Sequence, residues 1–266
     1  MTTLVLVLGW RLVLSLRRAR QFERLLGATD AKLMHLERQF ERFVPADVVE
    51  KLIDAGDALA PERRPVTILF ADLRGFTAMS ERLDPSVTVD ILNGYFGHMI
   101  AAIRRHHGHV TELVGDGLLA LFGALERNPW QERDAVLAAQ AMRAELSAYN
   151  RELTARGLPA LRFGVGIHCG DVVAGVIGTD GLSKFSVTGD PINVASRIEG
   201  LTRGFQVDVL VSDEIRAALD AQFRLRRMPA MQVKGKAEPI QTWHVLPEEF
   251  ASEEPGAAPV SPASAP

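Results

Sequence analysis

Residues 110–122 read VTELVGDGLLALF, two apolar runs on either side of Gly115-Asp116-Gly117. An Asp-Gly pair between two apolar runs is the strongest short-range signal for a β-hairpin, because these residues suit a tight turn. The stretch therefore predicts two antiparallel strands, at residues 110–114 and 118–122. A tight hairpin argues against a doubly wound parallel sheet, in which helices separate consecutive strands.

The region around this hairpin mixes strand and helix patterns. Residues 66–70 (VTILF) are short, apolar and β-branched, which is typical of a buried strand. Residues 85–107 repeat apolar side chains at a helical period, which predicts an amphipathic helix. Together with the hairpin they predict an α+β fold with a largely antiparallel sheet. The other predicted elements are a helix over 131–156, a strand pair over 162–168 and 171–177 with its turn at Cys169-Gly170, a helix over 190–201, a strand over 207–211, a helix over 213–219 and a strand over 242–246.

Length and charge limit the classes of protein that fit. The 266 residues suffice for one sizeable domain with extensions, since domains run to about 100–200 residues. The chain has 30 Lys+Arg against 33 Asp+Glu, so its formal net charge is -3. A nucleic-acid partner is not expected, because nucleic-acid binding needs a strongly basic face. A single cysteine, Cys169, excludes an internal disulfide and suits a reducing compartment.

The N-terminal residues 4–16 (LVLVLGWRLVLSL) are almost wholly apolar. The run is shorter than the roughly 20 residues that span a bilayer. Three interpretations stay open: a membrane-surface helix or truncated anchor, a helix packed on a partner, and a cleaved signal peptide. If residues 1–16 are an anchor, the arginines at 17, 18 and 20 place the catalytic domain in the cytoplasm.

Three further segments complete the expected organisation. Residues 17–60 predict a helical extension, and Leu33, Leu36, Phe40 and Phe43 form a short heptad seam within it. This linker either packs on its own domain or pairs two chains as a coiled coil. The main domain is expected over 61–248. Residues 249–266 are rich in Ala, Pro, Ser and Glu, which predicts a disordered tail.

Asp72 is the first candidate functional residue. It follows the strand over 66–70 in FADLRGFT (70–77), so a rigid strand end positions its carboxylate. The backbone N–H groups of the following turn, at Gly75, Phe76 and Thr77, can face a phosphate. Taken alone, an aspartate in this position is explained just as well by a role in capping a helix.

Asp116 changes that interpretation. Taken alone it is a turn residue, favoured for its backbone conformation. If the hairpin pairs beside the strand over 66–70, however, the carboxylates of Asp72 and Asp116 emerge at the same end of one sheet. Carboxylate oxygens suit Mg²⁺ or Mn²⁺. Two such ions can activate an attacking oxygen and stabilise a leaving one, which predicts phosphoryl chemistry on a nucleoside triphosphate.

Two further segments carry polar side chains. Asn193 and Arg197, in VTGDPINVASR (187–197), are four residues apart and share one helix face. An amide and a guanidinium on one face suit a ribose and a developing phosphate charge, although a surface polar pair is the plainer interpretation. Lys234 and Lys236, in VKGK, lie on a predicted turn that is either solvated or a triphosphate clamp.

In this order and spacing, FADLRGFT, ELVGDG, VTGDPINVASR and VKGKAEP resemble the class III nucleotidyl cyclases, the adenylate and guanylate cyclase catalytic domain. The resemblance implies a ferredoxin-like, palm-like sheet flanked by helices. It also implies a homodimer with two sites at its interface. The implied reaction is attack of the ribose 3′-oxygen on the α-phosphorus, which forms a 3′,5′-cyclic nucleotide and pyrophosphate.

The resemblance also implies roles for particular residues. Asp72, Asp116 and the Leu73 carbonyl would bind two Mg²⁺ or Mn²⁺ ions. The other protomer would supply the pair of residues that reads the base, together with Asn193 and Arg197 for the ribose and the transition state. Lys234 matches the family lysine on the terminal phosphates. The basic residue that the family often carries before the base-reading strand is absent, because Gly181 occupies its position and Lys184 is the nearest substitute.

Two positions bear on the base. Glu112 lies where adenylate cyclases typically have lysine and guanylate cyclases glutamate, and a carboxylate accepts from the guanine N1–H and amino group. Ser186 occupies the second position, where a hydroxyl decides little because it donates and accepts. Glu112 therefore favours GTP over ATP as the purine nucleoside triphosphate. The alternative function is a catalytically weak cyclase-like domain that binds nucleotide as a regulatory module.

Overall fold

The computed structural model describes residues 61–179, 182–233, 236 and 238–247, so the expectations for residues 1–16, 17–60 and 249–266 lie outside the described residues. The elements in chain order are β1 (Glu62–Leu73), α3 (Phe76–Ser80), α4 (Pro85–Arg105), β2 (His109–Val114), β3 (Gly117–Phe122), α5 (Gln131–Ala155), β4 (Phe163–Thr179), β5 (Leu182–Thr188), α6 (Asp190–Phe205), β6 (Val209–Ser212), α7 (Asp213–Ala218), β7 (Leu225–Arg227) and β8 (Thr242–Val245).

The strands form one sheet in the order β2-β3-β1-β4-β6-β8-β7, and β5 pairs with β4. All paired neighbours are antiparallel except β4 and β6, which run parallel. The expected α+β fold with a largely antiparallel sheet is therefore confirmed. The hairpin over 110–122 is confirmed as β2 and β3, and β3 pairs with β1 as the carboxylate argument required.

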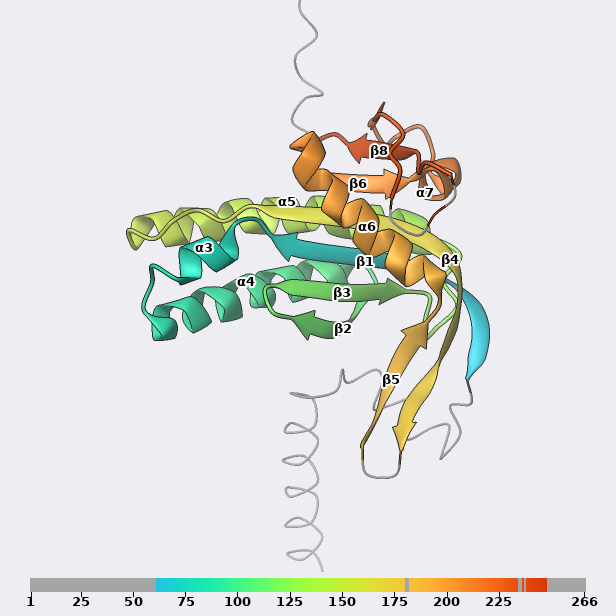
Figure 1. The fold of residues 1–266 in the computed structure, drawn as a ribbon, viewed down its shortest axis with the longest axis horizontal. Coiled ribbons are helices and arrows are strands. Elements are labelled where there is room, and N and C mark those ends of the chain that lie inside the picture. The colour runs from blue at the N-terminus through green and yellow to red at the C-terminus, as the bar shows by residue number, and fades with distance from the viewer. Residues whose placement is uncertain (1–60, 180–181, 234–235, 237, 248–266) are drawn as a thin grey trace, which may run out of the picture. The chain divides into compact units, whose positions relative to one another are not determined.

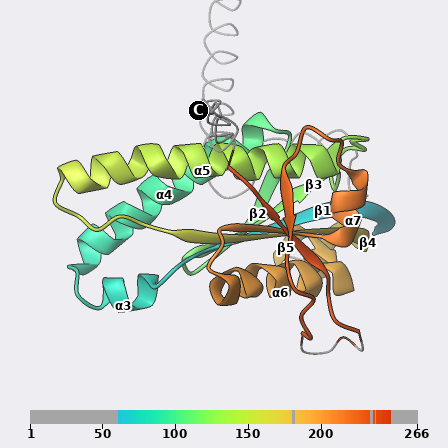
Figure 2. The ribbon, with the colours of Figure 1, turned by 90° about the horizontal axis from the view of Figure 1, so that it is seen from above.

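Helices cover both faces of the sheet (Figures 1 and 2), with α4 and α5 on one face and α6 on the other. Alternation along β1 explains how one strand serves both layers, since neighbouring side chains point to opposite faces. Leu69, Ala71 and Leu73 join the core beneath α4 and α5, whereas Val66 and Ile68 join the core on the α6 side. None of the helices among the described residues has the length and apolar character needed to cross a membrane.

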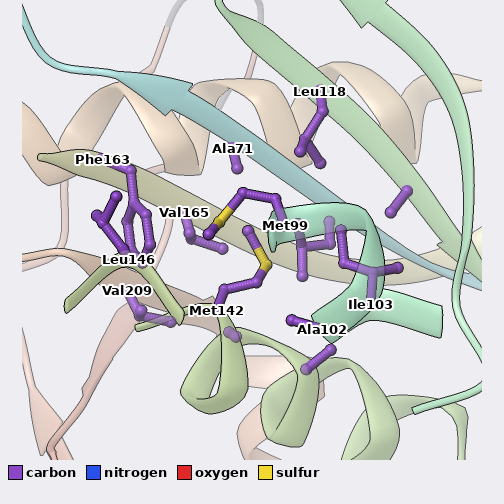
Figure 3. Packing of buried hydrophobic residues seen from close by; sticks show 14 of the residues in the cluster. Ala71, Met99, Ala102, Ile103, Leu118, Met142, Leu146, Phe163, Val165 and Val209 are labelled. Atoms are coloured by element: carbon purple, nitrogen blue, oxygen red, sulfur yellow. The ribbon is translucent and has the colours of Figure 1, made fainter. Parts of the chain in front are cut away.

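The larger core lies between the sheet and the helix pair α4 and α5. Figure 3 shows Met99 of α4 and Met142 of α5 side by side beneath Ala71 of β1 and Val165 of β4. All four side chains are buried. Small side chains on the strands leave room for the long, adaptable methionines between the layers. This core holds β1 at a fixed height above the helices, and β1 carries Asp72 at its end.

The prediction of two strands over 162–168 and 171–177, joined by a turn, is wrong. β4 runs without a turn from Phe163 to Thr179, and Cys169 pairs with Thr67 of β1 in the middle of the ladder. Gly170 suggested a turn, but it has a packing role instead: a Cβ there would lie 2.6 Å from Pro191 Cγ. The hairpin partner of β4 is β5, which together with β7 and the short α3 was not among the predicted elements.

Candidate active site

Asp72 and Asp116 come together at one end of the β1–β3 ladder. Ala71 pairs with Leu118, so Asp72 lies opposite Gly117, the residue that follows Asp116. A Cβ built on Gly117 would lie 3.0 Å from Asp72 Oδ1, which shows how closely the carboxylate approaches the turn. The antiparallel register thus brings two residues that are far apart in the sequence to one edge of the sheet.

Both carboxylates line a cavity of about 770 Å³ at this edge. The cavity brings together six of the predicted site residues, namely Asp72, Leu73, Gly75, Phe76, Thr77 and Asp116. Gly75 has a φ of 68°, a left-handed conformation that glycine adopts without strain, and it begins the short helix α3. This conformation turns the chain from β1 into α3, and the residues of this turn line the cavity beside the carboxylate pair.

The electrostatics of the pair suit a divalent cation. Burial raises the pKa of the Asp72 carboxyl above its usual range, and the negative charge of Asp116 raises it further. Arg203 acts in the opposite direction on the same pKa. Two carboxylates that repel each other at a half-buried edge are stabilised by a cation between them, and oxygen donors are what Mg²⁺ and Mn²⁺ prefer. The donor set therefore fits these metals.

Four polar residues on the cavity wall were not predicted from the sequence. They are Arg74, which follows β1, Arg162, which precedes β4, and Arg203 and Gln206 at the end of α6. Arg203 and Gln206 lie four and seven residues after Glu199, so the three share a helix face. That spacing is visible in the sequence, but nothing local indicates that this face of α6 meets Asp72.

Glycines on β4 allow α6 to approach the sheet closely. Gly164 pairs with Asp72 across the ladder, and a Cβ on it would lie 2.6 Å from Glu199 Oε1. A Cβ on Gly166 would lie 2.2 Å from the Glu199 backbone nitrogen. The carboxylate of Glu199 therefore lies next to the metal-binding candidates. Burial raises the pKa of Glu199 to about 7, with a further contribution from the charge of Asp72.

Asn193 and Arg197 lie on a different face of α6 and do not line this cavity. At about 100° per residue, their direction differs by roughly 130° from that of Glu199, Arg203 and Gln206. Asn193 is exposed, while Arg197 is half-buried. Arg197 Nη1 is buried and has no hydrogen-bond partner in the described part of the chain. One chain thus presents the carboxylate pair and the Asn–Arg pair in different directions.

The predicted base-reading residues lie on strands away from the cavity. Glu112 is half-buried on β2, next to a β-bulge that separates its pairing from that of Val110. Ser186 is half-buried on β5, opposite Gly175. Neither lines the cavity that holds Asp72.

The predicted phosphate-binding lysines are only partly described. Lys234 and Gly181 lie outside the described residues, as does the side chain of Lys184. Lys236 is described: its Nζ lies 2.5 Å from Asp190 Oδ2, at the first residue of α6. This ion pair attaches the predicted phosphate turn to the helix that carries Asn193 and Arg197.

The remaining candidates have structural roles. His107, just beyond α4, lies with its Nδ1 3.1 Å from Asp134 Oδ2. Cys169 is half-buried in β4, and burial raises the pKa of its thiol to about 12. Among the described residues, no group of three or more His, Cys, Asp or Glu side chains is placed to hold a metal ion. A metal at Asp72 and Asp116 would therefore need backbone and substrate oxygens as well.

Comparison with known proteins identifies related sequences and structures. The family model described as "Adenylate and Guanylate cyclase catalytic domain" matches residues 59–247. An adenylate cyclase of Anabaena cylindrica is 35% identical over 225 residues, which cover 80% of this chain and 44% of that protein. The solved structure of the guanylyl cyclase Cya2 has a TM-score of 0.67 at 36% identity, over 71% of this chain and 95% of that one.

A third relative was solved with a nucleotide. The guanylate cyclase domain of RhGC from Catenaria anguillulae, in complex with GTP, has a TM-score of 0.62 at 27% identity, over 70% of this chain and 98% of that one. The chain spans less than half of the adenylate cyclases that it matches, 44% of the Anabaena protein and 31% of one from Rhizobium meliloti.

Proposed function

Because the chain belongs to the adenylate and guanylate cyclase catalytic domain family, we propose that it converts a purine nucleoside triphosphate into the 3′,5′-cyclic monophosphate and pyrophosphate. The observation that carries the proposal is the common cavity of Asp72 and Asp116, which the loop from Leu73 to Thr77 also lines. A divalent metal at this pair supplies Lewis-acid stabilisation of the attacking and leaving oxygens. Asp72 and Asp116 would hold it, together with the Leu73 carbonyl.

The proposed site needs two chains. On one protomer Asn193 and Arg197 point roughly 130° away from the α6 face that meets Asp72, at about 100° per residue. In a homodimer, the Asn–Arg pair of one chain can face the carboxylate pair of the other. Two-fold symmetry then generates two equivalent sites in each dimer. Asn193 would then orient the ribose. Arg197, whose Nη1 has no hydrogen-bond partner among the described residues, would stabilise charge on the α-phosphate.

The remaining residues would bind the substrate. Gly75, Phe76 and Thr77 line the same cavity as the carboxylates, and their backbone N–H groups would bind triphosphate oxygens. Lys234 would contact the terminal phosphates. Glu112 would accept hydrogen bonds from the guanine N1–H and amino group, and Ser186 would complete the contact with the base. The preferred substrate is therefore GTP, with ATP as the competing purine.

The first test is pyrophosphate release from each of the four ribonucleoside triphosphates with Mn²⁺. We expect turnover of GTP and ATP, and GTP as the better substrate. Asp72→Ala should abolish turnover while circular dichroism and the dimer fraction stay unchanged. Failure of the parental protein to turn over any of the four would refute the proposed enzyme activity, and turnover by Asp72→Ala would refute the metal assignment.

The two-chain site is tested by mixing inactive variants. Asp72→Ala and Arg197→Ala should each be inactive alone, because each homodimer lacks one half of both sites. Mixing equal amounts should restore about a quarter of the parental activity, since half of the dimers are mixed and each holds one intact site. If mixed dimers form and stay inactive, the two residues do not act in one shared site.

A further inference from the structure

A second cavity, of about 740 Å³, lies beside the candidate active site. Residues of α5, β7, the start of β4 and the ends of α6 and β8 line it. Arg74, Arg162 and Gln206 line both this cavity and the one that holds Asp72 and Asp116. These three residues therefore form a common wall, and we call the new cavity the arginine cavity.

The charge of the arginine cavity is strongly positive. Five arginines line it, at positions 74, 143, 162, 224 and 226, against a single carboxylate, Asp208. The chain as a whole has a formal net charge of -3, so this concentration is local. A concave surface lined by charges of one sign focuses the electric field and raises the local concentration of counter-ions.

Asp208, the one carboxylate that lines the cavity, already has hydrogen-bond partners. Arg143 donates from Nε to Asp208 Oδ2 at 2.6 Å and from Nη2 to Oδ1 at 2.9 Å, a bidentate pair. His244 Nε2 lies 3.1 Å from Asp208 Oδ1. Burial would raise the pKa of Asp208, but the hydrogen bonds from His244 and Arg143 outweigh burial and hold the pKa well below its usual range. Asp208 thus neutralises Arg143 directly. Within the described residues, Arg74 is attracted by the charges of Asp208 and Glu199 but forms no ion pair with either.

Two of the remaining arginines, Arg74 and Arg226, are contacted by neutral groups. A guanidinium nitrogen of Arg74 donates to the Val207 carbonyl, and the Arg74 backbone N–H donates to the Arg162 carbonyl at 2.8 Å. Arg226 Nη2 lies 3.3 Å from His244 Nδ1. Within residues 61–179, 182–233, 236 and 238–247, no salt bridge involves Arg74, Arg162, Arg224 or Arg226. Cations gathered in a cavity without partners repel each other, and an anion between them removes that repulsion.

We propose that the arginine cavity is a binding site for a small phosphate-bearing anion. Guanidinium groups match phosphate oxygens in bidentate geometry, which makes arginine the preferred residue for such ligands. The cavity volume falls within the range of small-molecule sites, about 300–1,000 Å³. Two sources share this chemistry: an oligophosphate such as the pyrophosphate of the proposed reaction, and free inorganic phosphate. Binding itself does not depend on the proposed reaction.

The test is calorimetric titration of the full chain with pyrophosphate and, separately, with inorganic phosphate. EDTA is present so that the carboxylate pair cannot recruit the anion through a metal, and the ionic strength is kept at about 50 mM to limit screening. The test variant combines Arg224→Gln with Arg226→Gln, because both side chains are exposed and line the cavity. Circular dichroism and the melting temperature confirm that each variant is folded.

The matched control removes the same charge elsewhere. Arg227→Gln combined with Arg216→Gln replaces two exposed arginines that do not line the cavity, one of them adjacent to Arg226 on β7. The parental protein should bind, the test variant should bind at least about tenfold more weakly because two charge-assisted contacts are lost, and the control should change by less than about twofold.

Two results would overturn the proposal: no anion binding by the parental protein, or equal losses in the test and control variants. Asp72→Ala should bind the anion at least as tightly as the parental protein, because it removes a negative charge from the neighbouring cavity. Because this experiment contains no metal and no turnover, its failure is distinct from a failure of the proposed enzyme activity. Tighter binding of pyrophosphate identifies an oligophosphate as the ligand, and tighter binding of inorganic phosphate identifies the free anion.

Discussion

Glu199 should destabilise the metal-free fold at neutral and alkaline pH. Glu199→Gln should therefore make the folded protein more stable in this pH range. Its Oε1 would lie 2.6 Å from a Cβ on Gly164, the residue paired with Asp72. Burial and then the charge of Asp72 raise the pKa of Glu199 from 4.5 to about 7. Glutamine keeps the shape of the side chain and removes its charge, so the substitution isolates the electrostatic cost.

The pKa shift determines the direction and pH range of the effect. A carboxyl with a raised pKa binds its proton more tightly in the folded state than in the unfolded state. The stability that it contributes is fully present below pH 4.5 and is lost as the pH rises to about 7. The full shift would correspond to roughly 3 kcal/mol, but partial exposure and screening reduce this to about 1–2 kcal/mol.

For a domain of this size, that free energy corresponds to a rise in Tm of about 3–6 °C at pH 8. Thermal unfolding followed by circular dichroism in EDTA measures the difference between variant and parental protein at pH 8 and pH 4.5. The gain should be below about 1 °C at pH 4.5, because Glu199 is then protonated in the folded state. Glu152→Gln, at an exposed position on α5, is the matched control and should not change Tm.

Mn²⁺ provides a second comparison. A cation at Asp72 and Asp116 would cancel the charge that contributes to the raised pKa of Glu199, so the gain should shrink. It should not vanish, since burial is the larger cause of the shift. No gain at pH 8, or the same gain at pH 4.5, would show that Glu199 is not an electrostatic burden on the fold.

Two other substitutions test separate parts of the structure. Glu112→Lys should lower the ratio of GTP to ATP turnover at least about tenfold, measured as pyrophosphate release, because lysine cannot accept from guanine; an unchanged ratio would contradict the role of the carboxylate. Gly166→Ala should lower Tm by about 3–9 °C, because its Cβ would lie 2.2 Å from the Glu199 backbone nitrogen and overpacking costs about 1–3 kcal/mol. Gly97→Ala in α4, where nothing lies within 4 Å of the added Cβ, is the control and should leave the fold as stable or more stable.

Local patterns were sufficient for much of this fold. The β2–β3 hairpin was predictable because its turn chemistry and both apolar runs lie within thirteen residues, 110–122. The meeting of Asp72 and Asp116 followed from that hairpin once β3 was assumed to pair with β1. The continuity of β4 could not be predicted, since Gly170 is typical of a turn and its reason, contact with Pro191, arises from the distant start of α6.

The residues that line the two cavities could not be predicted either, because their meeting depends on the tertiary fold. Arg203 and Gln206 stand at helical spacing from Glu199, but the sequence does not tell which strand that face of α6 meets. The arginine cavity was even harder to predict from the sequence, because its five arginines come from segments between positions 74 and 226. Such a cluster forms only when the chain folds, so the nearly neutral composition gave no sign of it.

The close contact between α6 and β4 links the two halves of the proposed active site. Gly164 and Gly166 admit the face of α6 that carries Glu199 and Arg203 onto the sheet beside Asp72. The same contact sets the rotation of the helix, and rotation sets where Asn193 and Arg197 point. A side chain added at Gly166 should therefore impair both the carboxylate half of its own site and the Asn–Arg half offered to the partner. In the mixing experiment, Gly166→Ala should rescue neither Asp72→Ala nor Arg197→Ala, although those two rescue each other.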